Sequence, residues 1–195
     1  MNSLSDYLRN YLIVTNSSDY LPQLYKLCLA KVKNGRVIAI ITSQLYDFSN
    51  LLLELDINKD LLKNLIIMYY QTIDEISRKL LLLHSWSLLP SLVAVDLSQL
   101  LIAQSAASLS TASIMQKVTL CTVSLLTYLQ SIAAQLPKCL DDGHILCMTT
   151  GLLFLRSDVE NFGNTQIQTL KDLYFYKTEM YDEFADVAYK IEENW

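Results

Sequence analysis

The sequence predicts an α/β domain in which a mainly parallel sheet is covered by helices on both faces. Short, almost wholly apolar, β-rich runs alternate along the chain with segments of helical periodicity. Strands that are apolar on both faces have no polar side to turn to water, which is typical of a parallel sheet between helices. The length of 195 residues suits one domain with a full-sized core.

The first half of the chain carries three strand–helix pairs. The expected strands lie at 11–15, 37–42 and 65–69. The expected helices lie at 21–33, 47–56 and 72–85. The first helix should stop at Asn34 and Gly35, because glycine readily takes the left-handed conformation that ends helices. Thr72 and Glu75 have the spacing of a capping box, which marks the start of the third helix.

The second half adds two strands around a long helix. Pro90 breaks the chain before a buried strand over 91–96, and another strand is expected at 144–149. A helix over about 113–136, closed by Pro137, separates them. Two loops are expected, at 104–113 and 151–164. The aromatic C-terminal segment 173–191 should add one or two antiparallel edge strands.

The uncharged residues 118–136 are long enough to span a bilayer, but their Ser, Thr and Gln residues make a membrane span a poor interpretation. Apolar residues in this region recur at three- and four-residue steps and so mark one face of a helix. We therefore expect a core helix that covers the sheet. The apolar face consists of Ile114, Val118, Cys121, Leu125, Leu129, Ile132 and Leu136.

Composition restricts the function classes. The net charge of −5 argues against a generally basic nucleic-acid clamp. Only 18% of the residues are charged and 52% are apolar, so we expect an apolar patch that is buried against another subunit. The protein is expected to be an obligate hetero-oligomer that behaves poorly alone.

Cysteine and histidine usage gives no sign of a metal site. The four cysteines form no CxxC pair, and His84 and His144 are the only histidines. Three of the cysteines lie in apolar runs, which indicates reduced core thiols in a cytosolic or nuclear protein. The cysteines are Cys28, Cys121, Cys139 and Cys147.

The loop after the first strand occupies the position of a phosphate-binding loop but lacks its chemistry. A nucleotide loop of the form GxxxxGK, followed by Ser or Thr, uses glycine amides, a lysine and a hydroxyl to hold phosphates and magnesium. The segment 15–23 has no glycine and no lysine. We expect no nucleotide cofactor and no ATPase activity. The degenerate positions are Asn16, Ser17, Ser18, Asp19, Leu21, where the lysine should be, and Pro22, where the Ser or Thr should be.

Asp96 ends an apolar strand, as the magnesium-organising acid of a Walker B motif does. Without the lysine loop it has no phosphate-bound metal to organise. We interpret it as a Walker B-like remnant that forms hydrogen bonds or caps the next helix. No serine-hydrolase elbow, HExxH motif or carboxylate pair suggests another enzyme.

The order of these elements resembles the small RecA-like recombination mediators related to the Rad51 paralogs. The resemblance covers nearly the whole chain and is most specific in the runs 65–70, 72–81 and 90–96. It is closest to the subunit that accompanies the SWIM-domain zinc protein in the metazoan Shu complex. The resemblance implies a RecA-like fold, a nuclear location, and a role in homologous recombination, DNA repair and meiosis. The partners it implies are a SWIM-domain zinc protein and a Rad51-type recombinase on single-stranded DNA.

A second hypothesis is a RecA-like, non-catalytic scaffold subunit of the Elongator tRNA-modification complex. Those subunits also lack nucleotide motifs. They are usually longer, and their connection between the third strand and the Walker B strand is less compact than 65–96 here. A third hypothesis, a cryptic nucleotide-dependent enzyme, is disfavoured by the missing lysine. Co-purification of the partners discriminates between the first two.

Two surfaces are candidates for contacts. If single-stranded DNA is bound, we expect the loop 151–164 to touch it, with Arg156 as the cation and Phe154 and Phe162 as stacking surfaces. For a protein partner, Leu4, Tyr7 and Leu8 have the spacing of one face of a short helix that precedes the core. The aromatic C-terminal run 174–195 is a further candidate.

Overall fold

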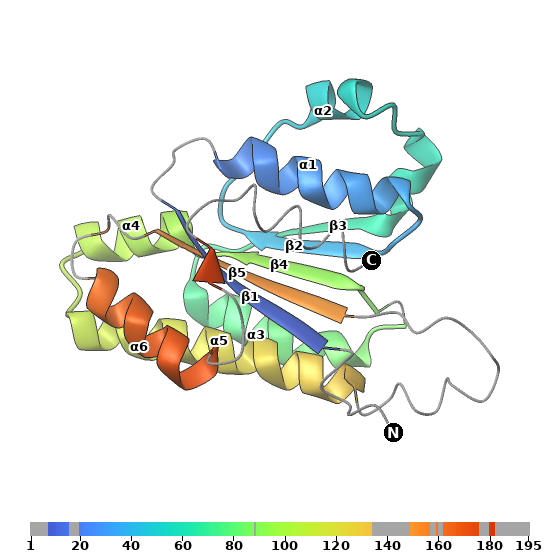
Figure 1. Cartoon of the computed structure of the whole chain (residues 1–195). Helices are drawn as coiled ribbons and strands as arrows, with labels where there is room; N and C mark the ends of the chain where they lie inside the picture. The colour runs from blue at the N-terminus through green and yellow to red at the C-terminus, as the bar shows by residue number, and fades with distance from the viewer. Residues whose placement is uncertain are drawn as a thin grey trace.

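The computed structural model describes residues 8–15, 20–87, 89–133, 149–156, 159, 162–175 and 180–181. Figure 1 shows a central sheet with helices on both sides. The strands are β1 (Leu8–Thr15), β2 (Ile38–Thr42), β3 (Leu65–Tyr69), β4 (Leu92–Asp96), β5 (Thr149–Arg156) and β6 (Met180–Tyr181). The helices are α1 (Tyr20–Lys33), α2 (Ser49–Glu54), α3 (Ile73–Leu82), α4 (Ser98–Ala106), α5 (Thr111–Ala133) and α6 (Asn164–Tyr174), with 3-10 turns η2 (Lys59–Asn64) and η3 (Leu83–Ser85).

The six strands lie in the order β3-β2-β4-β5-β1-β6, and every described strand pair is parallel. This confirms the predicted α/β class and the parallel sheet. The expectation of antiparallel C-terminal edge strands is wrong for the described residues, because β6 pairs in parallel with β1 and residues 173 and 174 belong to α6. A parallel edge fits a strand that is reached by a helical crossover, which α6 supplies.

The side chains of the strands alternate between two cores. On β2, Ile38 and Ile40 pack with α1 and α2, whereas Ala39 and Ile41 pack on the other face with α3 and α5. The two-residue period of a strand places successive side chains on opposite faces, so both faces of each central strand are buried. This is the arrangement that the continuous apolar strands predict.

Local signals at two helix ends behave as predicted. Thr72 and Glu75 form both hydrogen bonds of a capping box at the start of α3. At the end of α1, Gly35 has φ of 76°, and its N–H donates to Val32 O while the N–H of Arg36 donates to Lys31 O. This pair of bonds is a Schellman motif, which satisfies the last carbonyls of the helix.

The helix α5 covers the sheet through the predicted apolar face. Six of its seven expected members are buried, and Leu136 lies outside the described residues. Length and composition alone would allow α5 to cross a membrane. Its buried face packs against β5, α3 and α6, as a core helix does.

The main boundary differences lie in the second half of the chain. Residues 104–106 belong to α4 and residues 111–113 to α5, so the expected loop shrinks to 107–110. β5 runs over 149–156 rather than 144–149, and residues 144–148 lie outside the described part of the chain. The cause is Gly151, which resembles the start of a loop in the sequence. In the structure Gly151 lies within β5, where a Cβ atom would meet Leu129 Cδ1 at 2.8 Å, so glycine allows α5 to approach the strand.

Candidate functional site

The site that the topology favours is the carboxyl edge of the sheet between β2 and β4. The chain leaves β2 toward α2, on the face of α1, and leaves β4 toward α4, on the opposite face. Adjacent parallel strands whose connections diverge to opposite faces form a topological switch point, where α/β proteins bind ligands. Thr42 and Asp96 are the last residues of these two strands.

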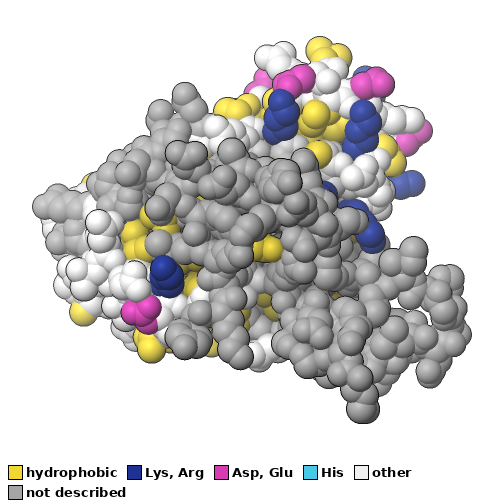
Figure 2. Space-filling model, in the orientation of Figure 1, with side chains coloured by type: hydrophobic (Ala, Val, Ile, Leu, Met, Phe, Trp, Pro, Cys, Tyr) yellow, Lys and Arg dark blue, Asp and Glu magenta, His cyan; other side chains and the backbone are white. Residues whose placement is uncertain are grey.

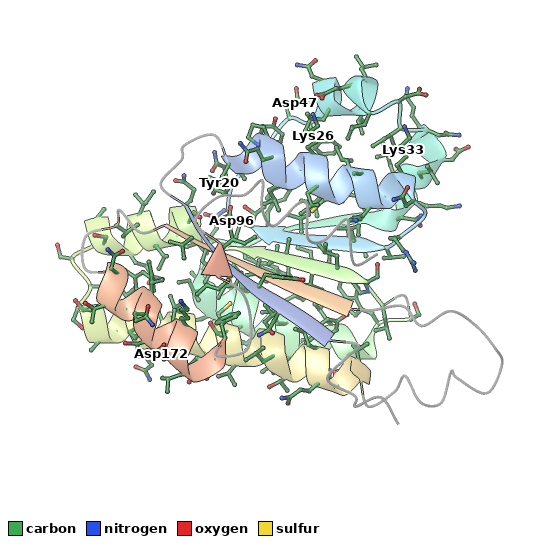
Figure 3. The ribbon with its side chains drawn as sticks, viewed as in Figure 1. Tyr20, Lys26, Lys33, Asp47, Asp96 and Asp172 are labelled. Carbon is green, nitrogen blue, oxygen red and sulfur yellow. The ribbon has the colours of Figure 1, made fainter. Side chains whose placement is uncertain are left out.

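Asp96 is the centre of a buried hydrogen-bond cluster at this point. Its Oδ2 accepts from Tyr20 Oη at 2.9 Å and from Thr42 Oγ1 at 3.1 Å, and its Oδ1 accepts from Ser98 N at 3.0 Å. Asp96 is 1% exposed and Tyr20 2% exposed. Figure 3 shows Tyr20 descending from the start of α1 toward Asp96. Protein donors therefore occupy both carboxylate oxygens.

The electrostatics of Asp96 reflect two opposing causes. Loss of water raises the pKa of its carboxyl group, and the hydrogen bonds from Ser98, Tyr20 and Thr42 lower it. The burial effect is the larger, so the pKa lies above the usual Asp value. The polar donors are thus needed to keep an acid at this position, because an unpaired buried carboxylate would be far more costly.

Neighbouring packing fixes Tyr20 over the switch point. The Tyr25 ring, five residues further along α1, lies 4.9 Å from the Tyr46 ring and 5.4 Å from the Phe48 ring, between centroids. Both of these rings belong to the segment that follows β2. The start of α1 is therefore held against the chain that leaves β2, and Thr42 Oγ1 also accepts from Gln44 N at 3.1 Å.

Two of the positions that a phosphate-binding loop would use lie at the start of α1. Leu21, where the lysine of a nucleotide loop would stand, is 4% exposed and belongs to the core cluster between α1 and the sheet. Pro22, where the Ser or Thr would stand, is partly buried in the first turn of α1. Asn16, Ser17, Ser18 and Asp19 lie outside the described residues.

No group of three His, Cys, Asp or Glu side chains comes together in the part of the chain that the structure describes. Magnesium prefers several oxygen ligands, and the oxygens of Asp96 already accept protein hydrogen bonds. Cys28 and Cys121 are free and buried, and burial raises the pKa of the Cys121 thiol to about 12.

The proposed DNA-contacting loop needs correction. Phe154 and Arg156 lie in β5, where they pair with Ile13 and Thr15 of β1, rather than in a loop. Phe162 is fully buried and packs in the core beneath the sheet, so it offers no stacking surface. Figure 2 shows lysine, arginine and acidic side chains intermixed over the α1–α2 region, where Lys26 forms an ion pair with Glu54.

The predicted N-terminal contact helix is also wrong at the one position that can be described. Leu8 begins β1 and pairs with Thr149 of β5. Leu4 and Tyr7 lie outside the described residues, as do residues 176–179 and 182–195 of the C-terminal run. Phe175, in contrast, is buried in the core.

The structure presents another surface, which we call the β3 edge. β3 ends the order of the sheet, with four partly buried side chains and an exposed Tyr69. The backbone N–H of Tyr70 donates to Thr42 O, so Tyr70 turns its backbone groups toward β2. Backbone groups alternate in direction along a strand, and those of Met68 and Ile66 therefore point toward β2 as well. Ile67 and Tyr69 therefore turn their backbone groups outward. No described residue pairs with this edge, and the strand carries no charge or proline that would discourage pairing.

Sequence reasoning found Asp96 but missed Tyr20 and Thr42. The signal for Thr42 was present, because the carboxyl ends of neighbouring parallel strands meet at one edge. Tyr20 carried no such signal, since a tyrosine at the start of a helix resembles an ordinary core residue. No known family model matches the sequence, and no curated protein shows significant similarity to it.

Proposed function

We propose that this chain is a non-catalytic, RecA-like subunit of a Shu-like complex, which supports the assembly of recombinase filaments on single-stranded DNA. The observation that supports a non-catalytic role is the buried hydrogen-bond cluster around Asp96. The acid at the end of β4 accepts from Tyr20, Thr42 and Ser98, where a working ATPase would use it to organise magnesium.

Two features support the RecA-like part of the proposal. The strand order β3-β2-β4-β5-β1-β6 differs from the dinucleotide-binding order 3-2-1-4-5-6 and from the flavodoxin order 2-1-3-4-5. In addition, the first residue of the helix that follows β1 contacts the acid at the end of β4. The start of α1, which holds the degenerate positions Leu21 and Pro22, therefore lies beside the Walker B-like acid, as the resemblance implies.

The partner in this proposal is a SWIM-domain zinc protein, a recombinase, or both. The β3 edge suits such a partner, because outward backbone groups at Ile67 and Tyr69 can accept an added strand. A strand added by a neighbour would supply hydrogen bonds through the main chain and specificity through its side chains. Any contact with DNA is then made through the complex.

Affinity purification of the tagged chain from nuclear extract tests this function. Recovery of a SWIM-domain protein or a recombinase supports it, whereas recovery of Elongator subunits would replace it with the tRNA-modification hypothesis. Ile67→Pro tests the β3 edge, since it removes an outward N–H that β2 does not use. We expect this variant to fold and to lose the partner, while Leu53→Asp, at an 82% exposed position on α2, keeps it.

A further inference from the structure

Exposed apolar side chains are concentrated on α3 and α5, which pack together on the side of the sheet opposite α1 (Figure 1). Four of the nine large apolar side chains that are exposed among the described residues belong to these two helices. They are between 39% and 57% exposed, and they are Leu81, Leu82, Leu120 and Val123. We call these four side chains, together with Arg78, the α3–α5 face.

The two helices run in the same direction along a common seam. Near the start of both helices, Lys117 of α5 forms an ion pair with Asp74 of α3 at 2.9 Å. Near the end of α5, the hydroxyl of Tyr128 donates to Pro90 O at 3.4 Å, beyond the end of α3. The ion pair therefore marks the side of each helix that faces the other.

The exposed side chains follow this seam. Arg78 and Leu81 lie four and seven residues after Asp74, and Leu120 lies three residues after Lys117. Residues at these spacings share one face of a helix, so the three side chains flank the seam. The other two members of the face adjoin them at the same three- and four-residue steps, which makes one continuous surface across both helices.

The acids near this face are already occupied. Residues 76–95 and 97–140 contain no Asp or Glu, although the chain has a net charge of −5. At the start of α3, Asp74 is paired with Lys117, and the Glu75 carboxylate accepts two backbone N–H groups at the helix cap. The local charge of the face is therefore set by the cations of α3.

Arg78 and Lys79 are these cations. Arg78 is exposed, and no ion pair joins it to an acid in the part of the chain that the structure describes. Lys79 Nζ lies 4.7 Å from the centroid of the Trp86 ring, a contact that leaves its charge without a carboxylate. Exposed leucines beside such cations favour a partner that combines apolar side chains with carboxylates.

The expected form of this partner segment is a helix. Within α3 and α5 the backbone groups are used in the helical hydrogen bonds, so the face offers side chains alone and no backbone groups for an added strand. An amphipathic helix laid on an apolar surface is the recognition mode that uses side chains alone. The β3 edge, in contrast, offers backbone groups.

We propose that the α3–α5 face binds an acidic amphipathic helix of a protein partner. The apolar side chains of that helix pack on the exposed leucines, and its carboxylates face Arg78 and Lys79. The charge of the face selects the partner, because a basic helix with the same apolar side chains is repelled. This binding is independent of the recombination role and of the β3 edge.

Fluorescence anisotropy of a labelled synthetic peptide measures binding to the full chain. The peptide has about 15 residues, with leucines at three- and four-residue steps and glutamates on the opposite face, and its counterpart has lysines instead of glutamates. We expect the glutamate peptide to bind at least about tenfold more tightly than the lysine peptide. Absence of binding up to about 500 micromolar protein, or equal binding of the two peptides, would overturn the proposal.

Charge reversal tests the role of the cation. Arg78→Glu should weaken binding of the glutamate peptide by about tenfold and strengthen binding of the lysine peptide, a gain that a misfolded variant would not show. The matched control is Lys63→Glu, at an exposed position of η2, which should leave both affinities unchanged. Leu82→Glu should likewise weaken binding, whereas Leu53→Glu on α2 should not. Equal effects of the paired variants would contradict binding at this face.

Three other occupants give different results. Binding of phosphatidylserine vesicles or of single-stranded oligothymidylate through Arg78, without binding of the glutamate peptide, would assign the face to a lipid or a nucleic acid and overturn the proposal. The chain itself has an acidic segment at 182–195, with five acids and one lysine. If the peptide bound only after these five acids were changed to amides in the full chain, the segment would be the occupant and no partner would be needed.

Discussion

The hydroxyl of Tyr20 donates a 2.9 Å hydrogen bond to Asp96, 76 positions further along the chain. The bond joins the start of α1 to the end of β4 across the switch point of the sheet. Thr42 donates to the same carboxylate oxygen from β2. Three separate elements therefore converge on one buried acid, and this arrangement predicts a structural role for Asp96.

Tyr20→Phe should lower the free energy of unfolding by about 1.5–3 kcal/mol, the usual contribution of a hydrogen bond to a charged group. The ring is retained, so the change removes the hydroxyl alone. Urea denaturation followed by circular dichroism measures the effect. In a double-mutant cycle, Tyr20→Phe and Asp96→Ala should give less than the sum of the single effects. Additive effects would show that the two side chains do not interact.

Asp96 should make stability fall as the pH rises. Because burial raises its pKa above the usual Asp value of 3.8, the folded protein holds this proton more tightly than the unfolded chain does. That contribution to stability is present below about pH 4 and is lost as the pH rises through the folded pKa. Relative to Asp96→Asn, the wild-type protein should lose stability between pH 4 and the folded pKa. If the stabilities of the two proteins changed with pH in the same way, the raised pKa of Asp96 would be refuted.

Asp96→Ala should behave differently from Asp96→Asn. Alanine leaves the hydroxyls of Tyr20 and Thr42 and the amide of Ser98 without their acceptor, and unsatisfied buried groups cost about 1–3 kcal/mol each. Asparagine still offers an oxygen to Ser98 and an amide to the two hydroxyls. We expect thermal unfolding to show a clear loss of stability for alanine and at most a small one for asparagine. Similar melting temperatures for the two variants would argue against this hydrogen-bond network.

The protein should not bind magnesium–ATP. The segment 15–23 has no glycine or lysine, Leu21 is buried at the lysine position, and Asp96 accepts protein hydrogen bonds. Isothermal calorimetry should detect no heat of binding, and a phosphate-release assay should stay at background. A dissociation constant in the micromolar range, which is about 8 kcal/mol of binding free energy, would disprove the pseudo-ATPase interpretation.

The central strands and the long helix could be predicted because their signals are local. The apolar runs at β2, β3 and β4, the Thr72 capping box and the face of α5 each depend on spacing within a few residues. The position of β5 could not be found in the same way. Gly151 is ordinarily a loop signal, and only the packing of Leu129 against it explains a glycine inside a strand.

The candidate site was predictable in part for the same reason. Asp96 stands at the end of an apolar strand, which is visible in the sequence. The strand order that brings Tyr20 and Thr42 to it depends on contacts between distant segments, and neither periodicity nor motif spacing encodes them. Phe162 illustrates the converse error, because its polar neighbours predict a loop while its ring is fully buried.

Gly35→Ala should cost about 1 kcal/mol of stability. Gly35 has φ of 76°, a left-handed conformation in which a side chain other than glycine is strained. No atom lies within 4 Å of an added Cβ, so steric crowding does not contribute and the effect isolates the backbone. Gly163→Ala is the matched control, because Gly163 has equal space and φ of −106°. Equal effects in chemical denaturation would contradict a conformational cause.

Cys28 and Cys121 should be unreactive toward thiol reagents in the folded protein. Both side chains are fully buried, and loss of water raises the pKa of each thiol, that of Cys121 to about 12. The thiolate is the reactive form, so at neutral pH reaction requires unfolding. In a Cys139→Ser and Cys147→Ser variant, Ellman's reagent should therefore release no colour in native buffer. In urea, two thiols per chain should react, along the same transition that circular dichroism records. Reaction within the mixing time of the native protein would show that this core opens without global unfolding.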